Sequence, residues 1–166
     1  KDTEEKNSKG KALNYWKVLN DLFTDRSGNT APQQSMWKYV RDIQHDMAAR
    51  AKWGITDSYE KGEHAPELTI MEGTNLKLKA GERITLHACA RNVDGGEVSV
   101  NWQIYPEASI GESWKKTILN AENAEADLII SSDAKTGNTI HVVACAEGDG
   151  EERLHHYQQI IVTVCA

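Results

Sequence analysis

Residues 98–107 read Val-Ser-Val-Asn-Trp-Gln-Ile-Tyr-Pro-Glu, and they set the expectation for the fold. Apolar residues occupy every second position, which is the pattern of a strand with one face packed and the other open to water. Trp102 falls on the apolar face, so we predict that it is the core aromatic of a sheet. Pro106 has no backbone N–H, so the strand must end or become an edge at Tyr105.

Similar short strands recur on both sides of this stretch, separated by clusters of Gly, Asn and Asp. The predicted strands cover residues 67–71, 82–91, 98–105, 116–119, 126–131, 139–147 and 157–164. Residues 75–79 have the composition of a turn-rich connector. Strands of this number and spacing are typical of a mainly β fold, an immunoglobulin-like antiparallel β-sandwich of about seven strands. A short α-helical segment precedes it.

The last hairpin requires more than a tight turn. A two-residue turn at Asp149-Gly150 would place Ile140 opposite Gln159, although the apolar residues of both strands should share one face. We expect a longer loop, or a bulge at residues 154–156, to restore the register.

Two stretches before the strands have helical periodicity. The first covers residues 11–23, and the second has Ser35 as its N-cap and ends before Gly54. The apolar stripe of the second helix is Met36, Val40, Ile43, Met47 and Ala51. The polar, Gly-containing and Pro-containing residues that follow indicate a domain boundary. We therefore expect a helical segment at residues 1–62 and the sandwich at residues 63–166.

The chain has 166 residues, a length that fits one domain with an appendage. Its formal net charge is -6. Nucleic acids and anionic membranes are bound by clustered Lys and Arg, so the acidic balance argues against both partners. No apolar stretch approaches the roughly 20 residues that span a bilayer. The charged residues 1–11 are not a signal peptide.

Cys89, Trp102 and Cys145 have the order and approximate spacing of the disulfide and tryptophan in an immunoglobulin domain. However, both cysteines fall on the polar faces of strands that belong to different sheets, so their side chains point apart. Val143 also stands where that pattern has a tyrosine. We therefore predict that Cys89, Cys145 and Cys165 are free.

The sequence offers no catalytic motif, so no catalytic residue, cofactor or metal is expected. It lacks a Gly-rich phosphate loop and a nucleophile motif, and its six histidines are scattered. Asp94-Gly95-Gly96 is more typical of a plain turn than of a calcium site. Glu107 and Glu112 are candidates for a glycosidase dyad, but their spacing fits a solvated loop equally well.

Aromatic residues give the best binding hypothesis. Tyr105 on the polar face and Trp114 in a polar loop, with Glu107 between them, are candidates for a carbohydrate-binding surface. The C–H groups of a pyranose pack on aromatic faces while its hydroxyls bind nearby polar groups. The alternative is that Trp114 caps the edge of the core or packs on the helical segment.

Several motifs in order resemble a known family over about residues 35–164. They are Met36-Trp37, Gln44-His45-Asp46-Met47-Ala48-Ala49-Arg50, Trp53, Glu63-His64-Ala65-Pro66, Asp94-Gly95, Trp102-Gln103-Ile104-Tyr105-Pro106-Glu107-Ala108, Tyr157 and Ile161-Val162-Thr163-Val164. The family comprises secreted bacterial proteins labelled cellulose-binding, with a nucleoside-hydrolase-like N-terminal domain and a C-terminal sandwich. The turn at residues 92–95 is less acidic than is usual in the family. The Asp-rich loop that carries metal and ribose in nucleoside hydrolases has no counterpart here.

The resemblance implies a secreted or periplasmic protein in which the sandwich is an accessory module. The helices would be the tail of an upstream hydrolase-like domain that packs on Trp37, Val40, Met47 and Trp53. The first hypothesis is thus a non-catalytic module that assists polysaccharide binding. The second is a structural or self-association module without a ligand. The third is part of a glycoside hydrolase whose catalytic residues lie upstream.

Overall fold

The computed structural model of the chain describes residues 5–6, 12–13 and 32–166. The chain divides into two compact units, Lys1–Ile43 and Gln44–Ala166. In the first unit, strand β1 (Glu5–Lys6) pairs antiparallel with β2 (Ala12–Leu13). The helix predicted over residues 11–23 is therefore wrong at Ala12 and Leu13, and its other residues lie outside the described ones. The domain boundary expected after residue 62 stays a prediction.

Helix α2 spans Pro32–Trp53, and the division between the units falls inside it. The helix begins before the predicted N-cap at Ser35, because proline is well suited to the first helical position, where its missing N–H is not needed. The predicted end before Gly54 is confirmed. Arg50 and Lys52 place positive charge in the last turn, where the helix dipole favours it.

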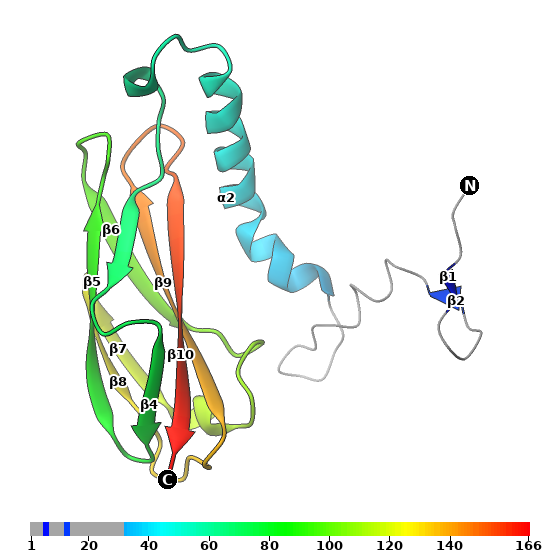
Figure 1. Cartoon of the computed structure of the whole chain (residues 1–166), viewed down its shortest axis with the longest axis vertical. Helices are drawn as coiled ribbons and strands as arrows, with labels where there is room; N and C mark the ends of the chain where they lie inside the picture. The colour runs from blue at the N-terminus through cyan, green and yellow to red at the C-terminus, as the bar shows by residue number, and fades with distance from the viewer. Residues whose placement is uncertain (1–4, 7–11, 14–31) are drawn as a thin grey trace. The chain divides into compact units, whose positions relative to one another are not determined.

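The second unit contains eight strands and two short 3-10 helices. The strands are β3 (Glu67–Ile70), β4 (Asn75–Lys79), β5 (Arg83–Arg91), β6 (Val98–Ile104), β7 (Ile118–Glu122), β8 (Glu125–Ile129), β9 (Thr139–Gly148) and β10 (His155–Cys165). The 3-10 helices are η1 (Tyr59–Lys61) and η2 (Ser113–Lys116). The strands form two four-stranded sheets, with orders β4-β10-β9-β6 and β3-β5-β8-β7 (Figure 1). The predicted β-sandwich preceded by a helix is thus confirmed.

Strand β4 is the main departure from the predicted architecture. It occupies residues 75–79, which were expected to be a connector, and it pairs in parallel with β10 along Ile161 to Cys165 (Figure 1). Leu76 and Leu78 alternate with polar residues, and Leu78 is buried in the core. Lysines in an edge strand such as β4 oppose pairing with other chains.

Strand β7 also differs from its prediction. It begins at Ile118 rather than at Lys116, because Lys116 belongs to η2. The hydrogen bond from the Thr117 backbone N–H to the Trp114 carbonyl, 3.3 Å long, closes this short helix just before the strand begins.

The core lies between the two sheets and follows the period-two pattern. Its fully buried large residues include Leu86, Leu128, Ile130, Ile140, Val142, Ile160, Val162 and Val164. Trp102 is half-buried and packs against this core, as predicted. Its indole N–H donates to the Asn123 carbonyl at 2.8 Å, so the polar edge of the ring is satisfied at the margin of the core.

The β9–β10 hairpin has the longer loop that the sequence requires. Residues 149–154 connect the strands, and Ile160 pairs with Val142 while Val162 pairs with Ile140. The apolar residues of both strands therefore share the core face.

Cys89 and Cys165 are free, as predicted. Cys89 is exposed on β5, whereas Cys145 lies on β9 in the other sheet. Because Cys89 is a free thiol, the immunoglobulin-type bridge between Cys89 and Cys145 is absent. This agrees with the placement of both cysteines away from the core-facing positions.

Candidate functional site

Two of the three residues predicted to bind a sugar lie directly after β6. Tyr105 is half-buried, and its backbone N–H donates to the His141 carbonyl at 2.7 Å. Burial, and to a smaller extent the negative charge of Glu107, raises the pKa of the Tyr105 phenol. Glu107 itself is exposed. The structure therefore brings Tyr105 and Glu107 into electrostatic range of each other.

The third predicted residue, Trp114, lies in η2 and packs against the sandwich core. The Lys115 ammonium group is 5.9 Å from the centre of its ring, which is within the range of a cation–π interaction. This placement fits the alternative in which Trp114 caps the core edge. The ring is half-buried, so part of it stays exposed.

A polar depression of about 490 Å³ lies beside η2. Its lining residues are Gly111, Glu112, Ser113, Lys115, Lys116, Ser131, Asp133, Lys135 and Asn138. The Ser113 hydroxyl donates to the Asn138 side-chain oxygen at 2.7 Å, which ties η2 to the loop before β9. This depression offers hydroxyl, amide and charged groups.

The two carboxylates of the depression are each paired with a lysine. The Lys115 ammonium group donates to Glu112 and lowers its pKa. The Lys116 ammonium group donates to Asp133, and it is the main cause that lowers the pKa of this carboxyl to about 2. Both carboxyls are therefore ionised at neutral pH and suited to accepting hydrogen bonds.

A second group of aromatic residues was not predicted as a site. It consists of Trp53 at the end of α2, Tyr59 in η1 and His64 before β3, and we call it the aromatic group. The ring centres of His64 and Tyr59 are 3.8 Å apart, and those of His64 and Trp53 are 5.4 Å apart. All three residues line a pocket of about 540 Å³. Tyr59 is 69% exposed. In the sequence, the only signal was an aromatic residue among the mostly polar residues 55–64.

Hydrogen bonds from the sandwich hold the aromatic group in place. The Asp94 carboxylate, in the loop between β5 and β6, accepts bonds from the His64 backbone N–H at 2.6 Å and from His64 Nδ1 at 2.8 Å. The Trp53 indole N–H donates to the Glu63 carbonyl at 2.9 Å. A Cβ atom on Gly62 would lie 2.9 Å from the Trp53 ring, so only glycine fits there. The turn at Asp94 thus acts as an anchor for His64.

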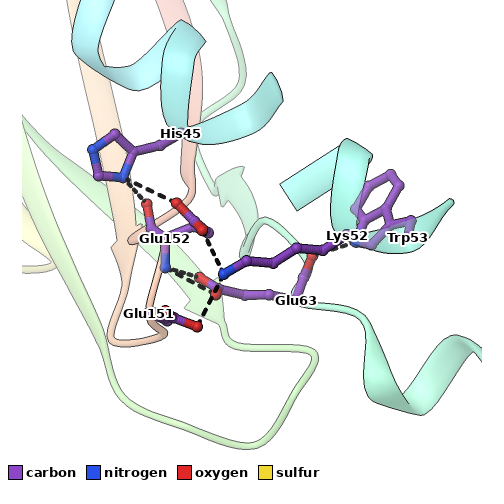
Figure 2. Close-up of polar contacts among 6 residues, drawn as sticks. All are labelled: His45, Lys52, Trp53, Glu63, Glu151 and Glu152. Atoms are coloured by element: carbon purple, nitrogen blue, oxygen red, sulfur yellow. Dashed lines mark hydrogen bonds and ion pairs between the residues drawn. The ribbon is translucent and has the colours of Figure 1, made fainter. Parts of the chain in front are cut away.

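A cluster of charged residues fixes the last turns of α2 to the β9–β10 loop (Figure 2). The Glu63 carboxylate accepts the backbone N–H of Glu152 at 2.9 and 3.1 Å. The Lys52 ammonium group lies 2.6 Å from the Glu152 carboxylate and 2.9 Å from that of Glu151, and these hydrogen bonds raise the pKa of Lys52. We call these residues, together with His45, the helix clamp.

His45 completes the helix clamp, because its Nδ1 lies 2.5 Å from the Glu152 carbonyl (Figure 2). Ala49, one turn further along α2, is fully buried. Met47 belongs to the predicted apolar stripe and is 64% exposed. Residues 44–53 therefore pack on the sandwich through a helix face that includes His45 and Ala49. The Met47 side chain lies off this face and is exposed to solvent.

The pKa of His141 is expected to lie below the ordinary histidine value of 6.5, and the pKa of His87 above it. Burial lowers the pKa of His141, whereas a hydrogen bond to Glu72 raises the pKa of His87. The stability contributed by His141 is therefore present above pH 6.5 and is lost as the pH falls through its folded pKa. The stability contributed by His87 is present below pH 6.5 and is lost as the pH rises through the pKa of His87 in the folded protein.

Proton NMR titration of the two imidazoles checks this prediction. The matched variant is Glu72→Gln, which removes the carboxylate 2.6 Å from His87 Nδ1. It should return the His87 pKa toward its ordinary value and leave that of His141 unchanged. Two pKa values on the same side of 6.5 would contradict the prediction.

The described residues contain no group of three His, Cys, Asp or Glu side chains placed to hold a metal ion. Within the same part of the chain, no helix has the length and apolar composition needed to cross a membrane.

Comparison with known proteins finds a protein family and solved structures to which this chain is similar. A search of curated proteins found no match. A solved structure of a nucleoside hydrolase-related hypothetical protein from Saccharophagus degradans, described as associated with carbohydrate metabolism, is similar at 25% identity and a TM-score of 0.71. The similarity covers 76% of this chain and 32% of that protein, so the chain spans about a third of its length. Residues 83–164 match the family model described as cellulose-binding protein Sde0182, C-terminal domain. This part of the chain is therefore similar to the C-terminal domain of cellulose-binding protein Sde0182.

Proposed function

We propose that this chain is a non-catalytic accessory module that helps a larger, secreted or periplasmic protein to bind a cellulose-like polysaccharide. The observation that carries the proposal is the extent of the family match. Residues 83–164 include Tyr105, Glu107 and Trp114, as well as every residue that lines the polar depression beside η2. The matched part of the chain thus contains both the predicted aromatic residues and the polar groups of the depression.

The exposed parts of Tyr105 and Trp114 would contact the C–H face of a pyranose, and polar groups would bind its hydroxyls. Glu107 and the carboxylates of the depression accept hydrogen bonds, while Lys115 and Lys116 donate them. We call Tyr105, Glu107, Trp114 and the polar depression the η2 surface.

The ionised state of the Glu112 and Asp133 carboxyls supports a role in binding rather than in hydrolysis. A glycosidase needs one carboxylic acid with a raised pKa to protonate the leaving group. The pKa values of Glu112 and Asp133 are instead lowered by their lysine partners. Neither Glu112 nor Asp133 is therefore suited to act as that proton donor.

Sedimentation with insoluble cellulose tests the proposal. The full chain should sediment with cellulose, and the variant Tyr105→Ala with Glu107→Gln should bind roughly tenfold more weakly, since a tenfold change corresponds to about 1.4 kcal/mol. Trp114→Ala is expected to weaken binding as well, but circular dichroism must show that it folds, because Trp114 packs on the core.

Tyr157→Ala, on β10, is the matched control for the loss of a tyrosine and should bind as the parent chain does. Undiminished binding by the Tyr105 and Glu107 variant would contradict the proposed surface. Absence of binding by the parent chain would favour the structural alternative.

The second candidate is a structural module that packs on an upstream hydrolase-like domain or on a second copy. Exposed apolar residues favour it, since Met47 and Ile55 lie at helical spacing in and just after α2 and both are exposed. In this arrangement residues 1–62 would be the tail of the upstream domain and residues 63–166 the accessory module. The upstream domain would pack on Trp37, Val40, Met47 and Trp53. Catalytic residues of a glycoside hydrolase, if the whole protein is one, would then lie upstream.

A further inference from the structure

We propose that the aromatic group of Trp53, Tyr59 and His64 forms a second sugar-binding site, which stacks one neutral hexopyranose ring on Tyr59. The choice of a sugar as the ligand rests on the proposed function. The site itself is separate, because its pocket and the polar depression beside η2 share no lining residue. It is thus distinct from the η2 surface.

The orientation of Tyr59 leaves one ring face for a ligand. The imidazole of His64 stacks on the ring, with the ring centres 3.8 Å apart and the planes at 24°. Tyr59 is nevertheless 69% exposed, so the face opposite His64 is open to solvent. An aromatic face of this kind packs against the axial C–H groups of a pyranose.

Polar groups line the same pocket as Tyr59. The pocket of about 540 Å³ is also lined by Thr56, Asp57 and Ser58, and its volume is in the range typical of small-molecule sites. Asp57 is paired with the Lys61 ammonium group at 2.6 Å. The negative charge in the pocket is therefore balanced, and hydroxyl and carboxylate oxygens remain to bind the hydroxyls of a neutral sugar.

The aromatic group is organised before any ligand binds. Only 12% of the His64 side chain is exposed, and the Asp94 carboxylate holds both its backbone N–H and its Nδ1. The Glu63 carbonyl fixes the Trp53 indole, and the Glu63 carboxylate belongs to the helix clamp. A rigid site of this kind loses little conformational entropy on binding, which favours affinity.

Tyr157 provides a matched comparison elsewhere on the domain. It also stacks on a histidine, His155, with ring centres 6.0 Å apart and planes at 13°. Neither residue lines the pocket that the aromatic group lines. Loss of Tyr157 therefore removes the same chemistry without removing the proposed site.

NMR titration of the full chain with soluble cellohexaose tests the proposal. The indole N–H signal of Trp53 should shift on titration, Tyr59→Ala should weaken that binding roughly tenfold, and Tyr157→Ala should leave it unchanged. Because Tyr59 is exposed, its replacement should not unfold the domain, and the dispersion of the spectrum confirms this. An unmoved Trp53 signal, or equal affinity for the parent and Tyr59→Ala, would overturn the proposal.

The Trp114 indole signal separates this proposal from the proposed function. If Trp114 shifts and Trp53 does not, the second site is wrong while the η2 surface stands. If Trp53 shifts and Trp114 does not, the second site is supported and the η2 surface is contradicted. If neither signal moves and the parent chain does not sediment with cellulose, both proposals fail.

Discussion

Replacement of Leu128 by alanine is expected to lower the free energy of unfolding by about 2–5 kcal/mol. Leu128 lies on β8, has no exposed surface, and pairs with Ile84 on one side and Leu119 on the other. The smaller side chain leaves a cavity between the sheets that the surrounding residues can fill only in part. Urea denaturation followed by circular dichroism measures the change.

Ile118→Ala is the matched control for Leu128→Ala. Ile118 lies on the neighbouring strand β7, is 50% exposed and is outside the core cluster. Its replacement removes a side chain of the same composition but leaves no closed cavity, so the free energy of unfolding should change much less. Equal effects of the two substitutions would show that Leu128 is not buried between the sheets.

Replacement of Glu63 by alanine is expected to be the second large loss, about 1.5–3 kcal/mol, which is the range for a hydrogen bond to a charged group. The carboxylate accepts the Glu152 backbone N–H at 2.9 and 3.1 Å, so its removal leaves this partly buried donor without its partner in the helix clamp. Urea denaturation gives the loss. Hydrogen exchange should also become faster in residues 44–53, because the helix clamp holds these turns.

Glu151→Ala serves as the control for the helix clamp. Its carboxylate binds the same Lys52 ammonium group at 2.9 Å, but the side chain is strongly exposed and accepts no backbone N–H of the loop. Exposed ion pairs contribute little to stability, so this variant should unfold almost as the parent does. If Glu151→Ala accelerated exchange in the helix as much as Glu63→Ala, the role given to Glu63 would be wrong.

The strands that alternate cleanly could be predicted because each has one face in the core. In β6, Val100 is buried while Ser99 and Asn101 are exposed, as the sequence pattern requires. The same reasoning placed Cys89 away from the core. Local periodicity is sufficient in such strands, since burial repeats with the geometry of the strand itself.

Strand β4 was missed because its evidence is not local. Asn75 and Lys77 have low strand propensity, and the pairing partner of Asn75 is Ile161, far along the chain. Parallel pairing also lacks the short turn that reveals a hairpin in a sequence. The short alternation at Leu76 and Leu78 was present, but it was outweighed by the polar residues around it.

The two candidate sites differ in what the sequence reveals. Tyr105 and Trp114 attracted attention as aromatic residues in polar surroundings, although the packing of Trp114 on the core depends on tertiary structure. The aromatic group is assembled when Asp94, 30 residues further along the chain, binds His64. No spacing in residues 53–64 indicates that contact, so the group becomes visible only in the folded chain.

The position of β10 in its sheet determines how late during synthesis that sheet can be completed. Although it is the last strand along the chain, β10 lies between β4 and β9 and is hydrogen-bonded to both. While the chain emerges from the ribosome, β4 has no neighbour in its sheet until residues 161–165 arrive. Contacts between such distant segments form slowly. The sheet can therefore be completed only after translation has passed residues 161–165.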